Sequence, residues 1–364
     1  MKPVRFGKWR RLLGVGVVAV ALSGCQDVLE SVENKAEYPL PKRLVNKMKA
    51  HDQRVRSPIM MRIYKQEGVL EVWKANSNGE YSLVKEYEIC RWSGELGPKF
   101  KEGDRQAPEG FYHIRPHQMN PRSSYYLSFN MGFPNNFDRA HDRTGSNLMV
   151  HGACSSAGCY SMTDEQVLEI YAFAREAFRG GQRAFQVQAF PFRMTAENMA
   201  AHRDNEHFEF WQMLKIGYDH FELTKRPPKI DVCNHRYVFN RVVEDDGEFI
   251  STEACPPSTL PPALEVAYAS HSQQYEVDFA EAVRRETEGN QTPVIGSLLA
   301  LALRGPVGAS APAETEAPAV PQWTEAAVPI PTSAPFEIRN AAPATAAPIG
   351  EVDGKKRWWK IWNR

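Results

Sequence analysis

The stretch NLMVHGACSSAGCYSMTDEQ, residues 147–166, joins an expected strand to an expected helix and holds a histidine and two cysteines between them. Residues 147–150 form a short β-rich run. Residues 163–166 have the form of a capping box, with a threonine N-cap, a glutamine three residues later and acidic residues in the first turn. Apolar residues then recur at helical spacing until Gly180-Gly181. The histidine and the cysteines therefore lie in a strand–loop–helix connection.

His151, Cys154 and Cys159 allow three interpretations of this loop. Their H-x2-C-x4-C spacing lacks the paired CxxC knuckle of a zinc site, and no second cluster lies nearby, so we expect no metal and no cofactor. A Cys154–Cys159 disulfide would need a tight loop through the four residues between them. A nucleophile is favoured, because a histidine or a helix N-terminus lowers a thiol pKa, and Gly158 lets a backbone N–H approach a reacting carbonyl.

The segments around this connection predict an α+β fold with a β-rich, mostly antiparallel first half. Glycine, proline and asparagine turns bound each expected strand. The expected strands are residues 59–64, 69–74, 81–89, 110–115, 125–131 and 184–190, and the expected helices after Gly180-Gly181 are 197–203 and 208–216.

The N-terminus reads as an export signal. Basic residues precede an apolar run, residues 12–22, that is too short to span a bilayer. Leu22-Ser23-Gly24-Cys25 resembles a bacterial lipobox at the end of the signal region, residues 1–25, in which Cys25 would take a lipid and become the first residue of the mature chain. An ordinary cleavage site with an incidental cysteine is the alternative. Either way the body of the chain is expected outside the cytoplasm, behind a polar tether at residues 26–57.

Composition limits the classes of partner. The 364 residues are 42% hydrophobic and 24% charged, enough to bury a sizeable core. The formal net charge is zero, which argues against a nucleic-acid partner because phosphate neutralisation needs a basic excess. Cys233 and Cys255 bracket a hairpin-like segment, residues 236–243 followed by a turn and residues 248–251, so a bridge between them is the simplest pairing. Two free thiols are the alternative.

The C-terminal third has three expected parts. Residues 231–304 form an extension with helical character at 264–286. Residues 305–354 form a linker too rich in alanine and proline to bury a core. The tail, residues 355–364, interleaves basic residues with tryptophans, which suits a membrane or wall surface. A merely adhesive tail is the alternative.

Several motifs in one order carry a resemblance to a known family. Ser156-Ala157-Gly158-Cys159 matches the [ST]-x-G-C signature of the L,D-transpeptidase (YkuD) catalytic domain, with His151-Gly152 as its upstream HG. The remaining motifs are similar to the YafK-like murein branch of that family. They are ICRWSGELGPK at residues 89–99, APEGFY at 107–112, GFPN at 132–135, DRAH at 138–141 and PFRMT at 191–195. The resemblance covers residues 58–230.

The resemblance implies a β-rich catalytic domain that transfers acyl groups on peptidoglycan stem tetrapeptides. Cys159 would attack the carbonyl on the L-centre of diaminopimelate, releasing the terminal D-alanine and leaving a thioester. His151 would activate the thiol, and the N–H groups of Gly158 and Cys159 would hold the oxyanion. An amine acceptor gives transpeptidation. Water gives hydrolysis.

Two departures from the family pattern affect substrate binding. Ala157 stands where a second histidine is common, and Tyr160 and Ser161 replace the usual Arg or Asn after the cysteine. Ser156, Lys99 and Arg139 are therefore the expected substrate contacts, with Arg143 as a further candidate.

Three functions fit these features. The first is a murein L,D-transpeptidase. The second is a hydrolase or amidase of the same family that cuts stem peptides or a wall-linked lipoprotein. The third is a membrane-anchored lipoprotein that binds the wall without catalysis. The sequence also leaves open whether Cys90 and Cys154 form a disulfide.

Overall fold

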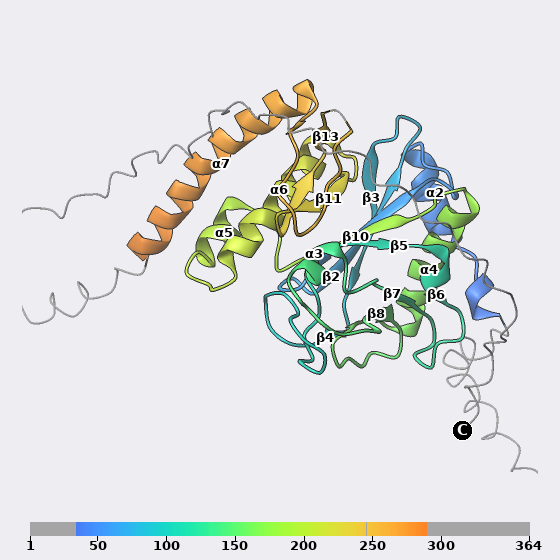
Figure 1. The fold of residues 1–364 in the computed structure, drawn as a ribbon. Coiled ribbons are helices and arrows are strands. Elements are labelled where there is room, and N and C mark those ends of the chain that lie inside the picture. The colour runs from blue at the N-terminus through green and yellow to red at the C-terminus, as the bar shows by residue number, and fades with distance from the viewer. Residues whose placement is uncertain (1–33, 245, 290–364) are drawn as a thin grey trace, which may run out of the picture. The chain divides into compact units, whose positions relative to one another are not determined.

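The computed structural model describes residues 34–244 and 246–289. The expected signal with Cys25, the end of the extension, the Ala/Pro-rich linker and the basic tail lie outside these residues. The described chain has an α+β fold with a β-rich core (Figure 1). None of the described helices combines the length and the apolar character needed to cross a membrane.

The first sheet has five strands in the order β3-β2-β1-β10-β5. Their bounds are β3 Tyr81–Glu88, β2 Val69–Ala75, β1 Ile59–Tyr64, β10 Phe185–Phe190 and β5 Gly110–Ile114. The parallel pair β1 and β10 lies in the middle, and every residue of both strands is buried. Helices cover both faces of this pair, so its polar residues are buried as well, and Arg62 of β1 donates to the Gln188 side chain of β10 at 3.0 Å.

The second sheet is built from short strands in the order β4-β9-β8-β7-β6. Their bounds are β4 Arg91–Trp92, β9 Tyr160–Ser161, β8 Met149–His151, β7 Ser128–Asn130 and β6 Met119–Asn120. Only β8 and β9 pair in parallel; the other pairs are antiparallel. Phe129, Val150 and Tyr160 send their side chains into the core shared with the first sheet. The mostly antiparallel β-rich half expected from the sequence is confirmed.

Helix α4 (Asp164–Arg179) begins where the capping box predicted. The Thr163 hydroxyl accepts from the Gln166 N–H at 3.3 Å, and the Gln166 side chain accepts from the Thr163 N–H at 2.9 Å. The helix packs an apolar face against both sheets. It stops at Gly180, where a Cβ would lie 2.0 Å from the Arg56 carbonyl oxygen, so only glycine allows this approach.

The described part of the expected tether is folded, which corrects the expectation of a free linker. Residues 35–37 form a 3-10 turn, and α2 (Lys42–Ala50) follows. Leu44 and Met48 of α2 enter the main core, and Arg43 bonds Glu169 of α4 at 2.9 Å. Apolar residues at i and i+4 bury one stripe of a short helix, and the polar composition of the segment hid that stripe.

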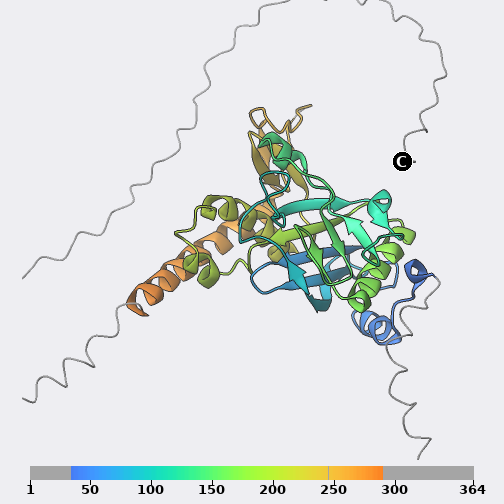
Figure 2. The same cartoon turned by 90° about the horizontal axis from the view of Figure 1, so that it is seen from below.

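In the described part of the chain three helices follow β10, and they are α5 (Ala196–Ala201), α6 (Phe208–Thr224) and α7 (Pro262–Gly289). Figure 1 and Figure 2 show them grouped on one side of the sheets, with α2 and α4 on the other. Helix α6 runs two turns beyond its expected end at residue 216. A Cβ on its Gly217 would lie 2.5 Å from the Phe239 ring, so this glycine marks a close packing contact rather than a helix end.

The segment after residue 230 packs on the same core. β11 (Ile230–Cys233) pairs with β12 (Arg236–Phe239), and β13 (Val242–Val243) pairs with β14 (Ser258–Thr259). This corrects the expected hairpin, because β12 pairs with the strand before it and not with residues 248–251. Phe239 shares an apolar cluster with Phe111 and Trp211. Cys233 is disulfide-bonded to Cys255.

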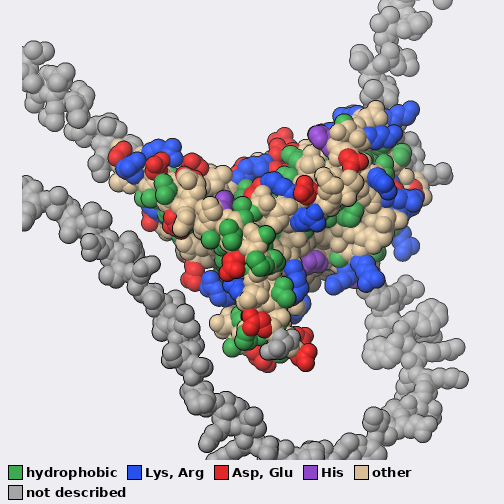
Figure 3. Space-filling view, turned by 90° about the horizontal axis from the view of Figure 1, so that it is seen from above, with side chains coloured by type: hydrophobic (Ala, Val, Ile, Leu, Met, Phe, Trp, Pro, Cys, Tyr) green, Lys and Arg blue, Asp and Glu red, His purple; other side chains and the backbone are tan. Residues whose placement is uncertain are grey.

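One face of the described chain mixes side chains of all kinds. Figure 3 shows basic, acidic and hydrophobic side chains interspersed over that face.

Candidate active site

Parallel pairing of β8 with β9 sets the relation between His151 and Cys159. His151 ends β8 and lies opposite Ser161 of β9. Cys159 directly precedes β9 and comes two residues before Ser161, so the strand pairing keeps it close to β8. The Cys159 Sγ accepts from the Met149 N–H at 3.4 Å, which holds the thiol against β8. Cys159 is half-buried and is the free cysteine of the described chain.

The loop between the two residues is held by Cys154, which is disulfide-bonded to Cys90. This bond removes Cys154 from both the zinc and the Cys154–Cys159 disulfide interpretations. Ala153 and Cys154 have φ values of 63° and 44°, in the left-handed region. The Ala153 N–H donates to Asp164 Oδ1 at 2.8 Å, so the first turn of α4 also anchors the loop. Within the described ranges, no group of three or more His, Cys, Asp or Glu residues is placed to hold a metal ion.

Ser156 closes the turn before the thiol. Its Oγ accepts from the Cys159 N–H at 3.1 Å and donates to the Cys159 carbonyl at 2.7 Å. Because its only proton is used there, the Ser93 hydroxyl, 2.8 Å away, is the donor in the third contact. The hydroxyl expected to contact substrate is thus occupied within the protein and positions Cys159.

The backbone conformation at position 158 requires a glycine, whereas the space around its Cα does not. Its φ is +121°, and a Cβ placed there would find its nearest neighbour, a Leu148 methyl carbon, at 3.6 Å. Among the described residues the structure records no hydrogen bond from the Gly158 N–H, whereas the Cys159 N–H is taken by Ser156.

The imidazole of His151 is oriented by its own neighbour. Nδ1 lies 2.6 Å from the Gly152 carbonyl oxygen, which can only accept, so Nδ1 carries the proton in the neutral ring and Nε2 is left with a lone pair. Burial lowers the pKa of His151, and the Gly152 contact opposes that shift. The Tyr125 ring packs beside it, with centroids 4.6 Å apart.

Burial raises the pKa of the Cys159 thiol, against the opposing effects of the Met149 N–H and the Lys99 charge. A raised thiol pKa and a lowered imidazole pKa both favour the neutral pair. No hydrogen bond joins Sγ to the imidazole in the described chain. These shifts favour a neutral thiol beside a neutral base over a preformed ion pair.

Lys99 and Arg139, the two cationic residues expected to contact substrate, lie in different surroundings. Lys99 is buried, pairs with Asp104 and donates to the Lys101 carbonyl at 2.9 Å, and its charge acts on the thiol. Arg139, on α3 (Asn136–Ala140), is exposed and bonds the Pro134 carbonyl and Asn136 beside it. The structure thus brings Lys99, and not Arg139, into electrostatic reach of Cys159.

Sequence reasoning missed the support under the loop of residues 89–99. Lys65 and Glu109 form a fully buried ion pair at 3.0 Å. Lys65 also donates to the Gly97 carbonyl at 2.9 Å, and Glu109 accepts from the Gly97 N–H at 2.7 Å and from the Trp211 indole at 2.8 Å. Partners this far apart in sequence give no local signal.

Asn147 was missed as well. Its carbonyl oxygen lies 3.8 Å from the Cys159 Sγ, within reach of an S–H donor, and its φ of 57° turns the chain into β8. Asparagine adopts the left-handed backbone region more readily than most residues, and this preference is the one signal that the sequence offered.

Comparisons with known proteins identify a family for most of the described chain. The model of the L,D-transpeptidase catalytic domain (YkuD) matches residues 60–179. Two proteins of Escherichia coli, from strain K12 and from O157:H7, are both named "Putative L,D-transpeptidase YafK". Each is 42% identical to this chain over 207 residues, which cover 57% of the chain and 83% of the relative.

Among solved structures, the helical cell shape determining protein Pgp2 from Campylobacter jejuni is 18% identical. The match covers 52% of this chain and 79% of that one, with a TM-score of 0.30, too low to support a statement on function.

Proposed function

Because the chain belongs to the L,D-transpeptidase family, as the E. coli relatives show, we propose that it is a peptidoglycan acyltransferase of the cell envelope whose nucleophile is Cys159. The observation that supports the proposal most is the register of the parallel pair β8–β9, in which Cys159, the free cysteine of the described chain, comes two residues before Ser161, the partner of His151.

The acylation step follows from these positions. Nε2 of His151 takes the proton of the Cys159 thiol as sulfur attacks the carbonyl on the L-centre of diaminopimelate in a stem tetrapeptide. The C–N bond to the terminal D-alanine breaks, and the imidazolium returns the proton to the leaving amine. A thioester on Cys159 and free D-alanine result.

The second step runs through the same base. His151 takes a proton from an acceptor amine as it attacks the thioester, and returns a proton to the departing sulfur. A diaminopimelate amine gives a new cross-link, and water gives hydrolysis. Cutting of a wall-linked lipoprotein is the corresponding reaction on a protein substrate.

The oxyanion donor in this proposal is the Gly158 N–H. No partner within residues 34–244 and 246–289 is recorded for it, and donors that are fixed before the reaction stabilise developing charge at little reorganisation cost. The Cys159 N–H, expected as a second donor, is held by Ser156. Ser156 is accordingly a positioning residue.

Incubation of purified protein with defined muropeptides, followed by mass spectrometry, tests the proposal. Wild-type protein should release D-alanine and form cross-linked or trimmed products. Cys159→Ser should abolish turnover with its fold retained, because a hydroxyl is a far weaker nucleophile than a thiolate. Ser155→Ala, at an exposed position of the same loop, is the matched control. Wall binding without any product from wild-type protein would instead support a catalytically silent lipoprotein.

A further inference from the structure

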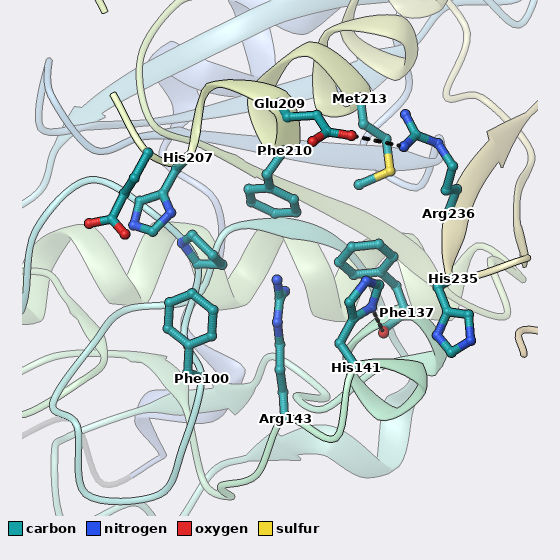
Figure 4. Close-up of a pocket in the computed structure, with 12 residues that line it drawn as sticks. Phe100, Phe137, His141, Arg143, His207, Glu209, Phe210, Met213, His235 and Arg236 are labelled. Atoms are coloured by element: carbon teal, nitrogen blue, oxygen red, sulfur yellow. Dashed lines mark hydrogen bonds and ion pairs between the residues drawn. The ribbon is translucent and has the colours of Figure 1, made fainter. Parts of the chain in front are cut away.

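A pocket of about 290 Å³ lies apart from Cys159 and His151. Its walls come from the loop at Phe100, from helix α3 and the residues after it, from the start of α6, and from the turn between β11 and β12 (Figure 4). The pocket therefore joins the segment expected as the catalytic domain to the extension after residue 230.

Arg143 lines this pocket, and not all of its side-chain N–H groups donate a hydrogen bond to the described residues. Its side chain is only 7% exposed, and Nη1 bonds Asp138 at 3.0 Å. Nε is enclosed without any hydrogen-bond partner, and among the described residues none is recorded for Nη2. Because Nε is enclosed by protein, a ligand in the pocket would accept from the terminal nitrogens of the guanidinium, of which Nη2 has no recorded partner among the described residues.

Aromatic rings hold the guanidinium in place. Its carbon lies 5.4 Å from the Phe100 ring centre, 5.0 Å from that of Phe137 and 5.2 Å from that of Phe210. Figure 4 shows the Arg143 side chain extending between Phe100 and Phe137 toward Phe210. The cation–π contacts fix the plane of the guanidinium, whose N–H groups form a planar fork. This geometry favours a ligand with planar acceptor oxygens over one whose negative charge is spread in other directions.

The other charges in the pocket limit what can bind. Arg236 pairs with Glu209 at 3.4 Å, and Glu206 adds a second acidic side chain. These acids disfavour a dianion such as phosphate, whereas a singly charged carboxylate meets the Arg143 fork with less repulsion. Phe100, at 53% exposure, offers apolar surface beside it.

The chain connects this pocket to the thiol. Arg143 lies in the pocket, and four residues later the Asn147 carbonyl contacts the Cys159 Sγ. Four residues span at most about 14 Å when fully extended, which is comparable to a stem tetrapeptide. Pro98 and Phe100 line the pocket, while Lys99 between them acts on the thiol.

We infer that this pocket binds a carboxylate of the peptide that reacts at Cys159, with the Arg143 guanidinium as its anchor. The inference rests on the proposed function for the identity of the peptide. It gives a role to the extension, because the turn between β11 and β12 completes the pocket.

A binding experiment with Cys159→Ala protein, which cannot turn over, tests this. The probes are a synthetic stem tetrapeptide and versions in which one carboxylate at a time is converted to the amide. Arg143→Lys keeps a charge beside Asp138 but loses the fork, and should weaken tetrapeptide binding about tenfold, or 1.4 kcal/mol. One amidated peptide should bind the parent equally weakly and should lose nothing further in Arg143→Lys.

Control variants and a stability measurement separate a loss of binding from a loss of folding. Arg122→Lys makes the same change at an exposed arginine outside the pocket and should bind like the parent. Thermal unfolding checks the fold. If Arg143→Lys unfolds, Arg236→Gln at the exposed rim should still weaken binding, by about threefold.

The inference fails if folded Arg143→Lys binds every peptide as the parent does or, where Arg143→Lys does not fold, if Arg236→Gln does so. It also fails if inorganic phosphate displaces the tetrapeptide from the parent at lower concentration than acetate does, which would make this a phosphate site. Turnover by Cys159-intact protein is measured separately. Turnover with unaltered binding in Arg143→Lys rejects the pocket alone, and carboxylate binding without turnover rejects the proposed function alone.

Discussion

The Ser156 hydroxyl contacts both backbone polar groups of Cys159, accepting from its N–H at 3.1 Å and donating to its carbonyl at 2.7 Å. One side chain thereby fixes the peptide units on either side of the nucleophile. Because Ser93 bonds the same hydroxyl at 2.8 Å, the turn is also tied to the residues just after β4.

Ser156→Ala should lower kcat by about tenfold or more, because small misplacements of a reacting group are costly. Removing the hydroxyl also leaves two backbone groups unpaired, so we expect a loss of about 1–3 kcal/mol in unfolding free energy. Steady-state kinetics and chemical denaturation measure the two effects, with Ser155→Ala as the control. Unchanged kcat in Ser156→Ala would show that the turn does not position Cys159.

Local patterns predicted the elements on which this site depends. The capping box at Thr163 predicted the start of α4, and the strand–loop–helix pattern predicted that His151 ends a strand and that Cys159 precedes the helix. Each of these signals lies within a few residues of the feature that it predicts.

Features that depend on distant partners were missed. The Lys65–Glu109 pair under the loop of residues 89–99, the packing of Met48 from α2, and the pairing of β12 with β11 all depend on which segments meet in space. Ser156 was assigned to substrate by the resemblance, and only its contacts reveal that the hydroxyl is occupied.

The pH dependence of kcat/KM should be bell-shaped. Burial lowers the pKa of His151 from its ordinary 6.5, so the neutral base persists to lower pH and the acid limb should lie below 6.5. Burial raises the pKa of Cys159 from its ordinary 9.0, so the proton needed by the leaving amine is lost only above 9. His151→Gln should abolish the acid limb. An acid limb above 6.5, or one that survives in His151→Gln, would contradict this assignment.

Loss of the Cys90–Cys154 bond should lower both stability and activity. Removing a disulfide that closes a long loop costs about 2–4 kcal/mol, and here it also frees the chain between His151 and Cys159. The double variant Cys90→Ala/Cys154→Ala should therefore lose about tenfold in kcat. Cys233→Ala/Cys255→Ala, which removes the other bond, should lose stability with little change in kcat. Equal kcat losses in both double variants would show a general effect of unfolding. Non-reducing peptide mapping should recover both linked pairs.

Membrane attachment should depend on Cys25. Cys25→Ser should release the protein to the soluble envelope fraction, because the lipobox-like sequence would no longer accept a lipid. Deleting residues 355–364 should leave the protein membrane-bound but weaken its salt-sensitive association with isolated wall or anionic vesicles. Cell fractionation at low and high salt measures both. Full membrane retention of Cys25→Ser in high salt would contradict lipid attachment.

The central claim is a thioester on Cys159, and intact-protein mass spectrometry tests it most directly. Protein mixed with a stem tetrapeptide without an acceptor and quenched in acid should gain the mass of the tetrapeptide less D-alanine. Peptide mapping should place that mass on Cys159, and Cys159→Ala should gain nothing. Release of D-alanine without any adduct on Cys159, or with the adduct on another residue, would contradict the account.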